Sequence, residues 1–399
     1  MHVEEHLEEL QRLADTAGAQ VIGKTIQRID APTPNFYIGQ GKVESLKDEM
    51  SSAGATLMLF DESLTPVQGV KLEKSLGVRV MDRTEVILDI FATRARSHEA
   101  KLQVELAQLE YLLPRLTRMW THLSRIRGGI GLRGPGETQL ETDRRVIRRK
   151  ISVLKKRLKD VAEHRANQRQ GRRDLPTAAL VGYTNAGKSS LLKALSGHDV
   201  FIEDRLFATV DTLAREVDVG EGYRYRLTDT VGFIRKLPHH LVASFRATLE
   251  EAEDADLLLH VIDASHAGWE DQLDVVEKET TSISPKRVIH VFNKADLLPD
   301  RDAFLALVRE RYPHAVLTST VRNEGVEQLR RALRTSAQAL RPIAEIRVPV
   351  TDGKLLATLH RDAEILHQEQ TNGVVTLRAR IEARLLGRLR QEGIEVVLG

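Results

Sequence analysis

Residues 182–189 read GYTNAGKS, which fits the pattern G-x-x-x-x-G-K-[ST] of a loop that binds nucleotide phosphates. The apolar run at 178–181 predicts a buried strand before this loop, and residues 191–195 predict a helix after it. Glycine lets backbone N–H groups turn toward phosphate oxygens, and a helix N-terminus adds partial positive charge. We therefore expect Lys188 to contact the β- and γ-phosphates and Ser189 to ligate Mg²⁺.

A second motif, N-K-x-D at residues 293–296, indicates that the base of the nucleotide is guanine. The Asp296 carboxylate can accept hydrogen bonds from the ring N–H and the exocyclic amine of guanine, which adenine cannot supply. Asn293 is expected to brace the site, and the stem of Lys294 is expected to lie along the base. The wrong base would leave the carboxylate unpaired, so the site should reject it strongly.

Three further segments complete the pattern of a GTPase. Residues 229–232 read D-T-V-G, where Asp229 would hold Mg²⁺ through water and the Gly232 N–H would contact the γ-phosphate. Thr209 is the candidate second direct ligand of Mg²⁺. Ser319 and Thr320 fit the loop that closes over guanine. Five motifs in this order predict a GTP-binding domain.

The predicted site draws on all five motifs. The predicted catalytic residues are Lys188, Thr209 and Gly232, and the predicted metal ligands are Ser189, Thr209 and Asp229. The residues expected to contact GTP or GDP are Gly182, Tyr183, Thr184, Asn185, Ala186, Gly187, Lys188, Ser189, Ser190, Phe207, Ala208, Thr209, Val210, Asp211, Asp229, Thr230, Val231, Gly232, Asn293, Lys294, Ala295, Asp296, Ser319 and Thr320.

Phe233 follows the D-x-x-G motif, where Ras-like GTPases carry the glutamine that orients the attacking water. Its ring neither donates nor accepts a hydrogen bond, so it cannot orient that water. Intrinsic hydrolysis is therefore expected to be slow, at or below roughly 10⁻⁴–10⁻² per second. The missing stabilisation must come from elsewhere in the chain or from a partner. The ring can also pack against the switch helix, which would not replace the glutamine.

Composition limits the class of protein. The chain has 399 residues, enough for two to four domains, and a formal net charge of only +2. It has no cysteine, which excludes disulfides and thiolate metal sites and fits a reducing cytoplasm. We see no signal peptide and no apolar run near eighteen residues, so we expect a cytoplasmic protein without stable membrane insertion.

The predicted fold class is α/β, and apolar patterning divides the chain into four parts. Alternating apolar runs and helical patterns before residue 95 predict a small parallel sheet, and two β-like runs after residue 341 flank helical patterns. The predicted domains are an N-terminal α/β domain (1–95), a basic coiled-coil hairpin with a Gly-rich loop (96–175), a P-loop GTPase domain (176–340) and a small C-terminal α+β domain (341–399).

The hairpin is predicted from two apolar seams with heptad-like spacing, and Pro114 should kink its first helix. The seams are Leu102, Leu106, Leu109, Leu113, Leu116 and Trp120, and then Leu140, Ile147, Ile151, Leu154, Leu158 and Val161. The second helix is strongly basic, through Arg144, Arg145, Arg148, Arg149, Lys150, Lys155, Lys156, Arg157, Lys159, Arg165, Arg169, Arg172 and Arg173. A solvated helix face is one interpretation; beside a GTPase, this density favours binding of RNA phosphates.

Two glycine-rich turns need separate interpretation. The hairpin tip at residues 127–136 contains G-x-G-x-x-G, but a helical pattern rather than a strand precedes it, which rejects a dinucleotide fold. Arg127 and Arg133 would allow this loop to contact RNA. The alternative is that the loop only connects the two helices. Residues 38–42 form a second glycine–lysine turn between an expected strand and a helix, and they are a weak candidate for a second nucleotide site.

The chain resembles the HflX family of translational GTPases over nearly its whole length. The resemblance rests on residues 36–42, 101–109, 134–145, 204–209 and 228–234, with Leu237 and Pro238 following. Two departures stand out. A helix-like stretch at 4–16 opens the chain where family members usually have a strand, and Thr212 stands where a proline commonly follows the switch aspartate.

The resemblance implies a Mg²⁺-dependent GTPase whose bound nucleotides are GTP and GDP. It would bind the large ribosomal subunit and its rRNA. It would act in the rescue or splitting of stalled ribosomes or in ribosome biogenesis, as a monomer stimulated by the ribosome, through in-line attack of water on the γ-phosphate. One alternative is a GTP-gated RNA-binding switch whose hydrolysis only resets binding. Another is a membrane-associated regulatory GTPase, which the lack of an amphipathic anchor disfavours.

Overall fold

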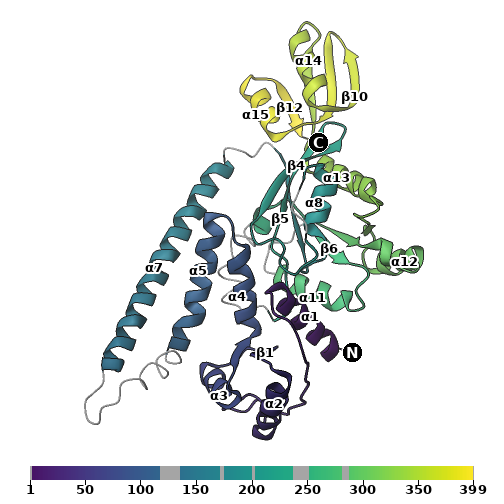
Figure 1. The fold of residues 1–399 in the computed structure, drawn as a ribbon. Helices are drawn as coiled ribbons and strands as arrows, with labels where there is room; N and C mark the ends of the chain where they lie inside the picture. Colours follow the sequence, from purple (N-terminus) through teal and green to yellow (C-terminus); the bar gives the residue numbers. More distant parts are fainter. Residues whose placement is uncertain are drawn as a thin grey trace.

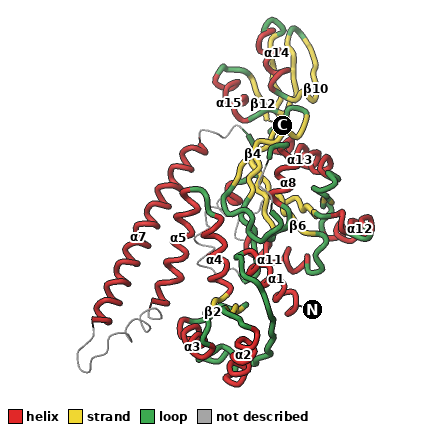
Figure 2. Tube along the Cα trace, viewed as in Figure 1, coloured by secondary structure: helices red, strands yellow, loops and turns green. Residues whose placement is uncertain are grey.

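The computed structural model describes residues 2–116, 135–170, 175–199, 203–236, 251–280 and 287–398 (Figure 1, Figure 2). Several sequence-based expectations fall outside these residues: Trp120, the hairpin tip at 127–134 with Arg127 and Arg133, Arg172, Arg173, Leu237 and Pro238. The side chains of Leu140 and Arg169 are also outside the described set. None of the described helices is both long and apolar enough to cross a membrane.

The N-terminal part contains the strand–helix–strand unit that the sequence predicts. Its elements are α1 (His2–Thr16), α2 (Gln40–Ala53), β1 (Leu57–Phe60), α3 (Pro66–Leu76), β2 (Arg79–Asp82) and α4 (Arg83–Arg94). Strands β1 and β2 pair in parallel, and α3 between them begins with a capping box formed by Thr65 and Gln68. Helix α1 confirms the helical start of the chain. The strand expected before residues 38–42 is absent, because Thr33 and Tyr37 form only an isolated bridge before α2.

A long helical hairpin projects from the body of the molecule (Figure 1). It consists of α5 (His98–Leu112), the 3-10 turn η1 (Leu113–Arg115) and α7 (Pro135–Gln170). Leu102 and Leu106 pack against Ile151 and Leu154, as the two seams predict. The α-helix changes to a 3-10 turn at Pro114, which confirms the predicted interruption. Helix α7 already begins at Pro135, so the last two residues of the predicted tip loop are helical.

A six-stranded sheet forms the centre of the molecule, in the order β4-β5-β3-β6-β7-β8. Only the edge strand β4 is antiparallel to its neighbour; the other pairs are parallel. The strands are β3 (Thr177–Gly182), β4 (Leu213–Gly220), β5 (Tyr223–Asp229), β6 (Leu257–Asp263), β7 (Arg287–Asn293) and β8 (Val316–Leu317). The central strand β3 is an almost wholly buried apolar run, as expected for a parallel sheet covered on both faces.

Helices cover both faces of this sheet. On one face, α8 (Lys188–Ser196) and α13 (Val326–Leu340) contribute Leu191, Leu195, Leu329 and Leu333 to a core with the strands. Toward the other face lie α11 (Trp269–Thr280), η3 (Ala295–Leu297) and α12 (Arg301–Arg311).

The N-terminal helices share a core with the same sheet. A single apolar cluster contains Leu10 of α1, Phe91 of α4, Val104 of α5, and Val181 of β3. The N-terminal helices, the hairpin and the sheet are therefore joined by buried contacts, and the four domain limits given above remain predictions.

The C-terminal part is a four-stranded antiparallel sheet with the element order βαββαβ. Its elements are β9 (Ile343–Pro349), α14 (Gly353–Asp362), β10 (Glu364–Thr371), β11 (Val374–Arg380), α15 (Ala383–Gln391) and β12 (Glu395–Leu398). The sequence pattern indicated β9 and β11 but not β10 and β12. Tyr223 of β5 hydrogen-bonds Glu364 of β10, and the Arg341 guanidinium lies 4.1 Å from the centre of the Tyr223 ring.

Candidate nucleotide-binding site

The phosphate loop connects the C-terminal end of β3 to the first turn of α8, as its sequence predicts. Two of its glycines are required by close contacts. A Cβ atom at Gly182 would lie 2.2 Å from the Val261 carbonyl oxygen, and one at Gly187 would lie 2.2 Å from Nδ2 of Asn293. Gly187 also has φ 95°, a left-handed conformation that favours glycine at the residue before a helix. The loop is therefore held tightly between β6 and the guanine motif.

Lys188 is buried at the start of α8 beneath this loop. Its Nζ donates hydrogen bonds to the carbonyl oxygens of Gly182 (3.2 Å) and Tyr183 (2.9 Å). Burial lowers the pKa of Lys188 to about 8, against the opposing effect of the Asp229 carboxylate. A Cβ atom at Gly232 would come within 2.9 Å of this Nζ, so the structure brings together Lys188 and Gly232.

Three oxygen-bearing side chains, the predicted metal ligands, converge next to the loop. Ser189 Oγ lies 2.7 Å from Thr209 Oγ1 and 2.6 Å from Asp229 Oδ2, and Thr209 Oγ1 lies 3.2 Å from the same Oδ2. Asp229 is fully buried, and burial raises its pKa while Lys188 and the two hydroxyls oppose that rise. Its Oδ1 has no hydrogen-bond partner in the described part of the chain. Hydroxyl and carboxylate oxygens with one unsatisfied buried atom fit a bound Mg²⁺.

The guanine motif follows β7 and is fastened to the phosphate loop through Asn293. The Asn293 side chain donates from Nδ2 to the Ala186 carbonyl (3.1 Å) and accepts at Oδ1 from the Thr318 hydroxyl (3.2 Å). The side chain is 1% exposed, so both bonds are protected from water. Asn293 therefore braces the site, as the sequence predicts.

Lys294 and Asp296 lie at the surface of this motif. Lys294 adopts a left-handed conformation with φ 62°, and its Nζ lies 2.7 Å from Oδ2 of Asp263. The Asp296 carboxylate accepts a hydrogen bond from the Ser319 hydroxyl (2.6 Å), which lowers the Asp296 pKa. Asp296 is therefore an anion at neutral pH, held by the loop predicted to close over the base.

Three family descriptions match successive parts of the chain: "GTP-binding GTPase N-terminal" at residues 4–92, "GTP-binding GTPase Middle Region" at 94–172 and "50S ribosome-binding GTPase" at 177–294. "GTPase HflX" of Magnetococcus marinus is 44% identical over 400 aligned positions, which cover 98% of this chain and 92% of the relative. The chain belongs to the HflX family of GTPases. "GTPase HflX" of Escherichia coli strain K12 is 42% identical over 383 positions, covering 94% of this chain and 90% of the relative.

The comparisons confirm the resemblance, the P-loop GTPase fold and the hydrolysis of GTP. A solved structure of a GTP-binding protein from Sulfolobus solfataricus in complex with GDP covers 84% of this chain and 96% of its own chain, with 26% identity and a TM-score of 0.47. Membership of the HflX family, and not this structural likeness, makes the chain a GTPase that binds guanine nucleotides.

In this HflX-family chain, the segment around Thr209 is docked on the N-terminal helices. The Phe207 ring meets the Phe91 ring of α4 edge to face, with centroids 4.7 Å apart, and the Phe207 N–H donates to Thr184 Oγ1 (2.8 Å). Val210 is buried in the same cluster. The Asp211 carboxylate accepts hydrogen bonds from the N–H groups of Arg96 (2.8 Å) and Ser97 (3.2 Å) at the start of α5. The side chains of Phe207, Val210 and Asp211 thus make interdomain contacts instead of lining the phosphate site.

Phe233 lies against the phosphate loop through its backbone. Its N–H donates to the Gly182 carbonyl (3.0 Å), and its carbonyl accepts from the Thr184 N–H (2.7 Å). The ring is buried in the apolar cluster that the N-terminal helices share with the sheet. Whether it also packs against the switch helix concerns residues 237–250, which lie outside the described part.

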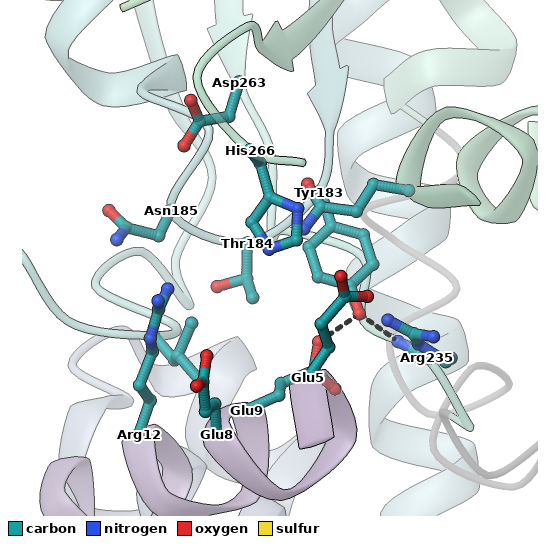
Figure 3. Close-up of a pocket in the computed structure, with 12 residues that line it drawn as sticks. Glu5, Glu8, Glu9, Arg12, Tyr183, Thr184, Asn185, Arg235, Asp263 and His266 are labelled. Atoms are coloured by element: carbon teal, nitrogen blue, oxygen red, sulfur yellow. Dashed lines mark hydrogen bonds between the residues drawn. The ribbon is translucent and has the colours of Figure 1, made fainter. Parts of the chain in front are cut away.

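Helix α1 covers one side of the loop with acidic side chains (Figure 3). Its Glu5, Glu8 and Glu9 line a small cavity of about 40 Å³ together with loop residues Tyr183, Thr184 and Asn185. The Tyr183 hydroxyl hydrogen-bonds Glu9 and accepts from the Arg235 N–H (2.9 Å), as the dashed lines in Figure 3 show. The Tyr183 side chain therefore points toward α1, so only its backbone can take part in a phosphate cradle.

The remaining predicted residues divide into two groups. Thr230 donates its hydroxyl to the Leu180 carbonyl (2.7 Å), and Val231 is buried in the shared cluster, so their side chains support the fold. Ser190, Ala208, Ala295 and Thr320 lie in the same segments as the other site residues, with Ala295 fixed by its N–H to the Thr318 carbonyl (3.0 Å).

Three polar residues that hold the site are absent from the predicted site residues. Asp263 pairs with Lys294, Thr318 pairs with Asn293, and Asp204 accepts a hydrogen bond from Asn185 Nδ2 (2.9 Å). The sequence does indicate a role for Asp263, because this residue ends an apolar strand at the edge of the sheet where the other motifs lie. Thr318 begins the loop predicted to close over guanine, and Asp204 lies in the family-like segment 204–209, but neither segment shows which side chain the residue contacts.

Proposed function

We propose that this GTPase uses Mg²⁺ held by Ser189, Thr209 and Asp229, and that it acts on the large ribosomal subunit. When bound, Mg²⁺ would neutralise charge on the β- and γ-phosphate oxygens. Lys188, freed from its two carbonyl partners, would place its ammonium on the same phosphates. The Gly232 N–H would bind the γ-phosphate, so Thr209 and Gly232 would read the presence of GTP.

Asp296 would select guanine in this proposal. Its carboxylate stays charged at neutral pH, and the Ser319 hydroxyl occupies only Oδ1. The anion can therefore accept the two N–H groups on the edge of guanine, while Asn293 holds the loop against the phosphate loop.

The contacts of Phe233 support a requirement for a partner. Its ring is buried among apolar side chains, and its backbone groups already bond to the phosphate loop. A residue in this position does not present a polar group to an attacking water. The group that orients the water must then come from another residue or from the surface to which the protein binds.

The basic face of helix α7 is the proposed contact surface for the partner. Lys150, Lys155, Lys159 and Arg165 have acidic partners, which include Glu105 and Glu110 of α5 for the first two. Among the basic side chains on α7 that are exposed and have no acidic partner within the described part of the chain, four lie between residues 148 and 157: Arg148, Arg149, Lys156 and Arg157. We call these four the outer basic cluster. Unpaired cations along a projecting helix suit the phosphates of structured RNA.

Large-subunit RNA is the RNA that the family relationship favours. The family description matched by residues 177–294 is "50S ribosome-binding GTPase". We infer that α7 contacts this RNA while the GTPase part reads the nucleotide. As the family resemblance implies, the action would be rescue or splitting of stalled ribosomes, or ribosome biogenesis.

Co-sedimentation with purified large ribosomal subunits tests this proposal. A variant with Arg148, Arg149, Lys156 and Arg157 all changed to Gln should bind much less than wild type in the presence of a non-hydrolysable GTP analogue. A control with Lys150→Gln and Lys155→Gln removes charges that already have partners, so its binding should stay close to wild type. Equal binding by all three proteins would show that the interaction surface is not the outer basic cluster.

The same experiment separates the alternatives. Equal binding to free rRNA and to large subunits, without stimulated GTP turnover, would favour a GTP-gated RNA-binding switch. Flotation with lipid vesicles in the absence of ribosomes would favour a membrane-associated regulatory GTPase.

A further inference from the structure

Two histidines face each other in the middle of the GTPase sheet. His260 of β6 and His290 of β7 are direct neighbours in the parallel register, and their ring centroids are 5.6 Å apart. Glu277 of helix α11 lies over the same pair, with Oε1 3.7 Å from His290 Nε2. One ligand atom from each of the three residues lies within 4.8 Å of the other two. None of these residues belongs to the proposed nucleotide site.

His260 has no hydrogen-bonding partner for its ring nitrogens in the described part of the chain. Its side chain is nevertheless almost completely buried, with the residue 3% exposed. Buried polar side chains normally have at least one partner, because leaving such an atom unpaired after its removal from water is costly. This imidazole, beside a second imidazole and a carboxylate, therefore leaves a nitrogen lone pair available to a ligand.

Among the described residues, one side of the cluster is covered and another is open. The Tyr312 ring stacks on His290 with centroids 4.0 Å apart, and it closes the side toward α12. The Glu277 side chain is 39% exposed, so the cluster opens toward solvent past α11. Arg311 is the nearby cation: its guanidinium lies 4.0 Å from Oε2 of Glu277 and would have to release that oxygen.

The histidines are in the protonation state that binds metal. Burial lowers the pKa of His260 to about 3 and that of His290 to about 4. Both rings are therefore neutral at pH 7, and no proton has to be displaced from either nitrogen.

We propose that His260, His290 and Glu277 bind one Zn²⁺ ion, with water as the fourth ligand. Two imidazoles and one carboxylate are a donor set that zinc accepts, whereas Mg²⁺ prefers oxygen ligands alone. Tetrahedral zinc needs ligand atoms about 3.3 Å apart, as follows from metal–nitrogen bonds of about 2.0 Å. The three ligand atoms lie within 4.8 Å of one another, so both imidazoles and the Glu277 carboxylate would move closer together around the ion. The ion would tie α11 to β6 and β7.

The ion would lie behind the phosphate loop, since His260 is paired in register with Val181 of β3. Zinc binding should therefore raise the thermal stability of the GTPase part. Zinc binding should not require nucleotide, because the zinc ligands are separate from Ser189, Thr209 and Asp229.

Metal titration of the full chain, without an affinity tag and saturated with GDP and Mg²⁺, tests the proposal. Calorimetry should show one Zn²⁺ per chain, and Co²⁺ used as a probe should give the intense visible absorption of a four-coordinate site. Glu277→Gln should weaken Zn²⁺ binding at least about ten-fold, as loss of a ligand or of its support does at such sites. Glu270→Gln on the same helix is exposed and distant from the histidines, so it is the matched control and should bind like wild type.

Thermal unfolding gives a second readout. Zn²⁺ should raise the melting temperature of wild type and of Glu270→Gln, and a chelator should reverse the change, while Glu277→Gln should show little response. Absence of Zn²⁺ binding in wild type would overturn the proposal. Equal binding and equal stabilisation in wild type and Glu277→Gln would also overturn it, because the ion would then be held elsewhere.

Discussion

The Asp211 carboxylate accepts hydrogen bonds from Ser97, the residue that caps the N-terminus of helix α5. The Ser97 N–H lies 3.2 Å from each carboxylate oxygen, and the Ser97 hydroxyl bonds to the same group. Asp211 is two residues after Thr209, the proposed γ-phosphate-dependent metal ligand, and α5 packs on the basic helix α7. The nucleotide segment and the hairpin are therefore joined by a direct contact between residues 114 positions apart in the sequence.

A double-mutant cycle with Ser97→Ala and Asp211→Asn measures this contact. Ser97→Ala should lower the free energy of unfolding by about 1 kcal/mol or more, because it removes the helix cap on the Ala100 N–H and the hydroxyl bond to Asp211. Asp211→Asn should lower it by about 1 kcal/mol, because the neutral amide is a weaker acceptor. The two should be less than additive, with a coupling energy of about 1 kcal/mol, because they remove the same interaction. Chemical denaturation of the four proteins provides the measurement. Fully additive effects would mean that the two residues act independently.

Guanine selectivity should depend on Asp296. Asp296→Asn removes a charged acceptor, so GTP and GDP should bind more weakly by a few kcal/mol, about two charge-assisted hydrogen bonds. The amide can instead donate to the 2-oxo group of xanthine nucleotides, so preference should shift toward them. Calorimetry with both nucleotides checks this, and unchanged GTP affinity would remove Asp296 from the base site.

The two hydroxyl ligands should differ in their response to nucleotide. Ser189→Ala should impair binding of both GDP and GTP, since Ser189 lies in the first turn of α8 and is fixed beside Asp229. Thr209→Ala should spare GDP and weaken binding of a GTP analogue, because Thr209 engages the metal only when the γ-phosphate is present. Ser196→Ala, at the other end of α8 and outside the predicted site, is the control and should change neither. Equal loss of both nucleotides in Thr209→Ala would contradict the switch role.

Nucleotide binding should take up protons near pH 8 through Lys188. In the free protein its pKa is lowered to about 8, so about half of the side chains are neutral at that pH. Phosphates beside the ammonium would raise the pKa and keep it charged, which draws protons from solution. GDP titrations in buffers of different ionisation enthalpy should show up to about half a proton taken up at pH 8 and little from Lys188 at pH 6.5. No difference in uptake between the two pH values would contradict this assignment.

The sequence predicts the local parts of the site well and the long-range contacts poorly. The strand before Gly182 and the helix after Lys188 follow from patterns within a few residues. The docking of Phe207 on Phe91 depends on the arrangement of two distant segments, and no local pattern carries that information. Side-chain direction is equally hidden: no local pattern indicates that the Asp211 carboxylate contacts Ser97.

Strand β10 illustrates a different limit. Its sequence, EILHQEQT, is mostly exposed, and it is held by pairing with β11. It therefore lacks the apolar alternation by which a strand is recognised. Its partner β11 alternates buried and exposed residues and was visible in the sequence.

GTP turnover with and without purified large ribosomal subunits tests the central proposal most directly. Phe233 leaves the free protein without a water-orienting side chain, so turnover of the free protein should be slow. Added subunits should raise it at least about ten-fold, which corresponds to about 1.4 kcal/mol of barrier. The variant that lacks the outer basic cluster should keep the slow rate and lose most of the increase. Turnover that is the same with and without large subunits would contradict the account.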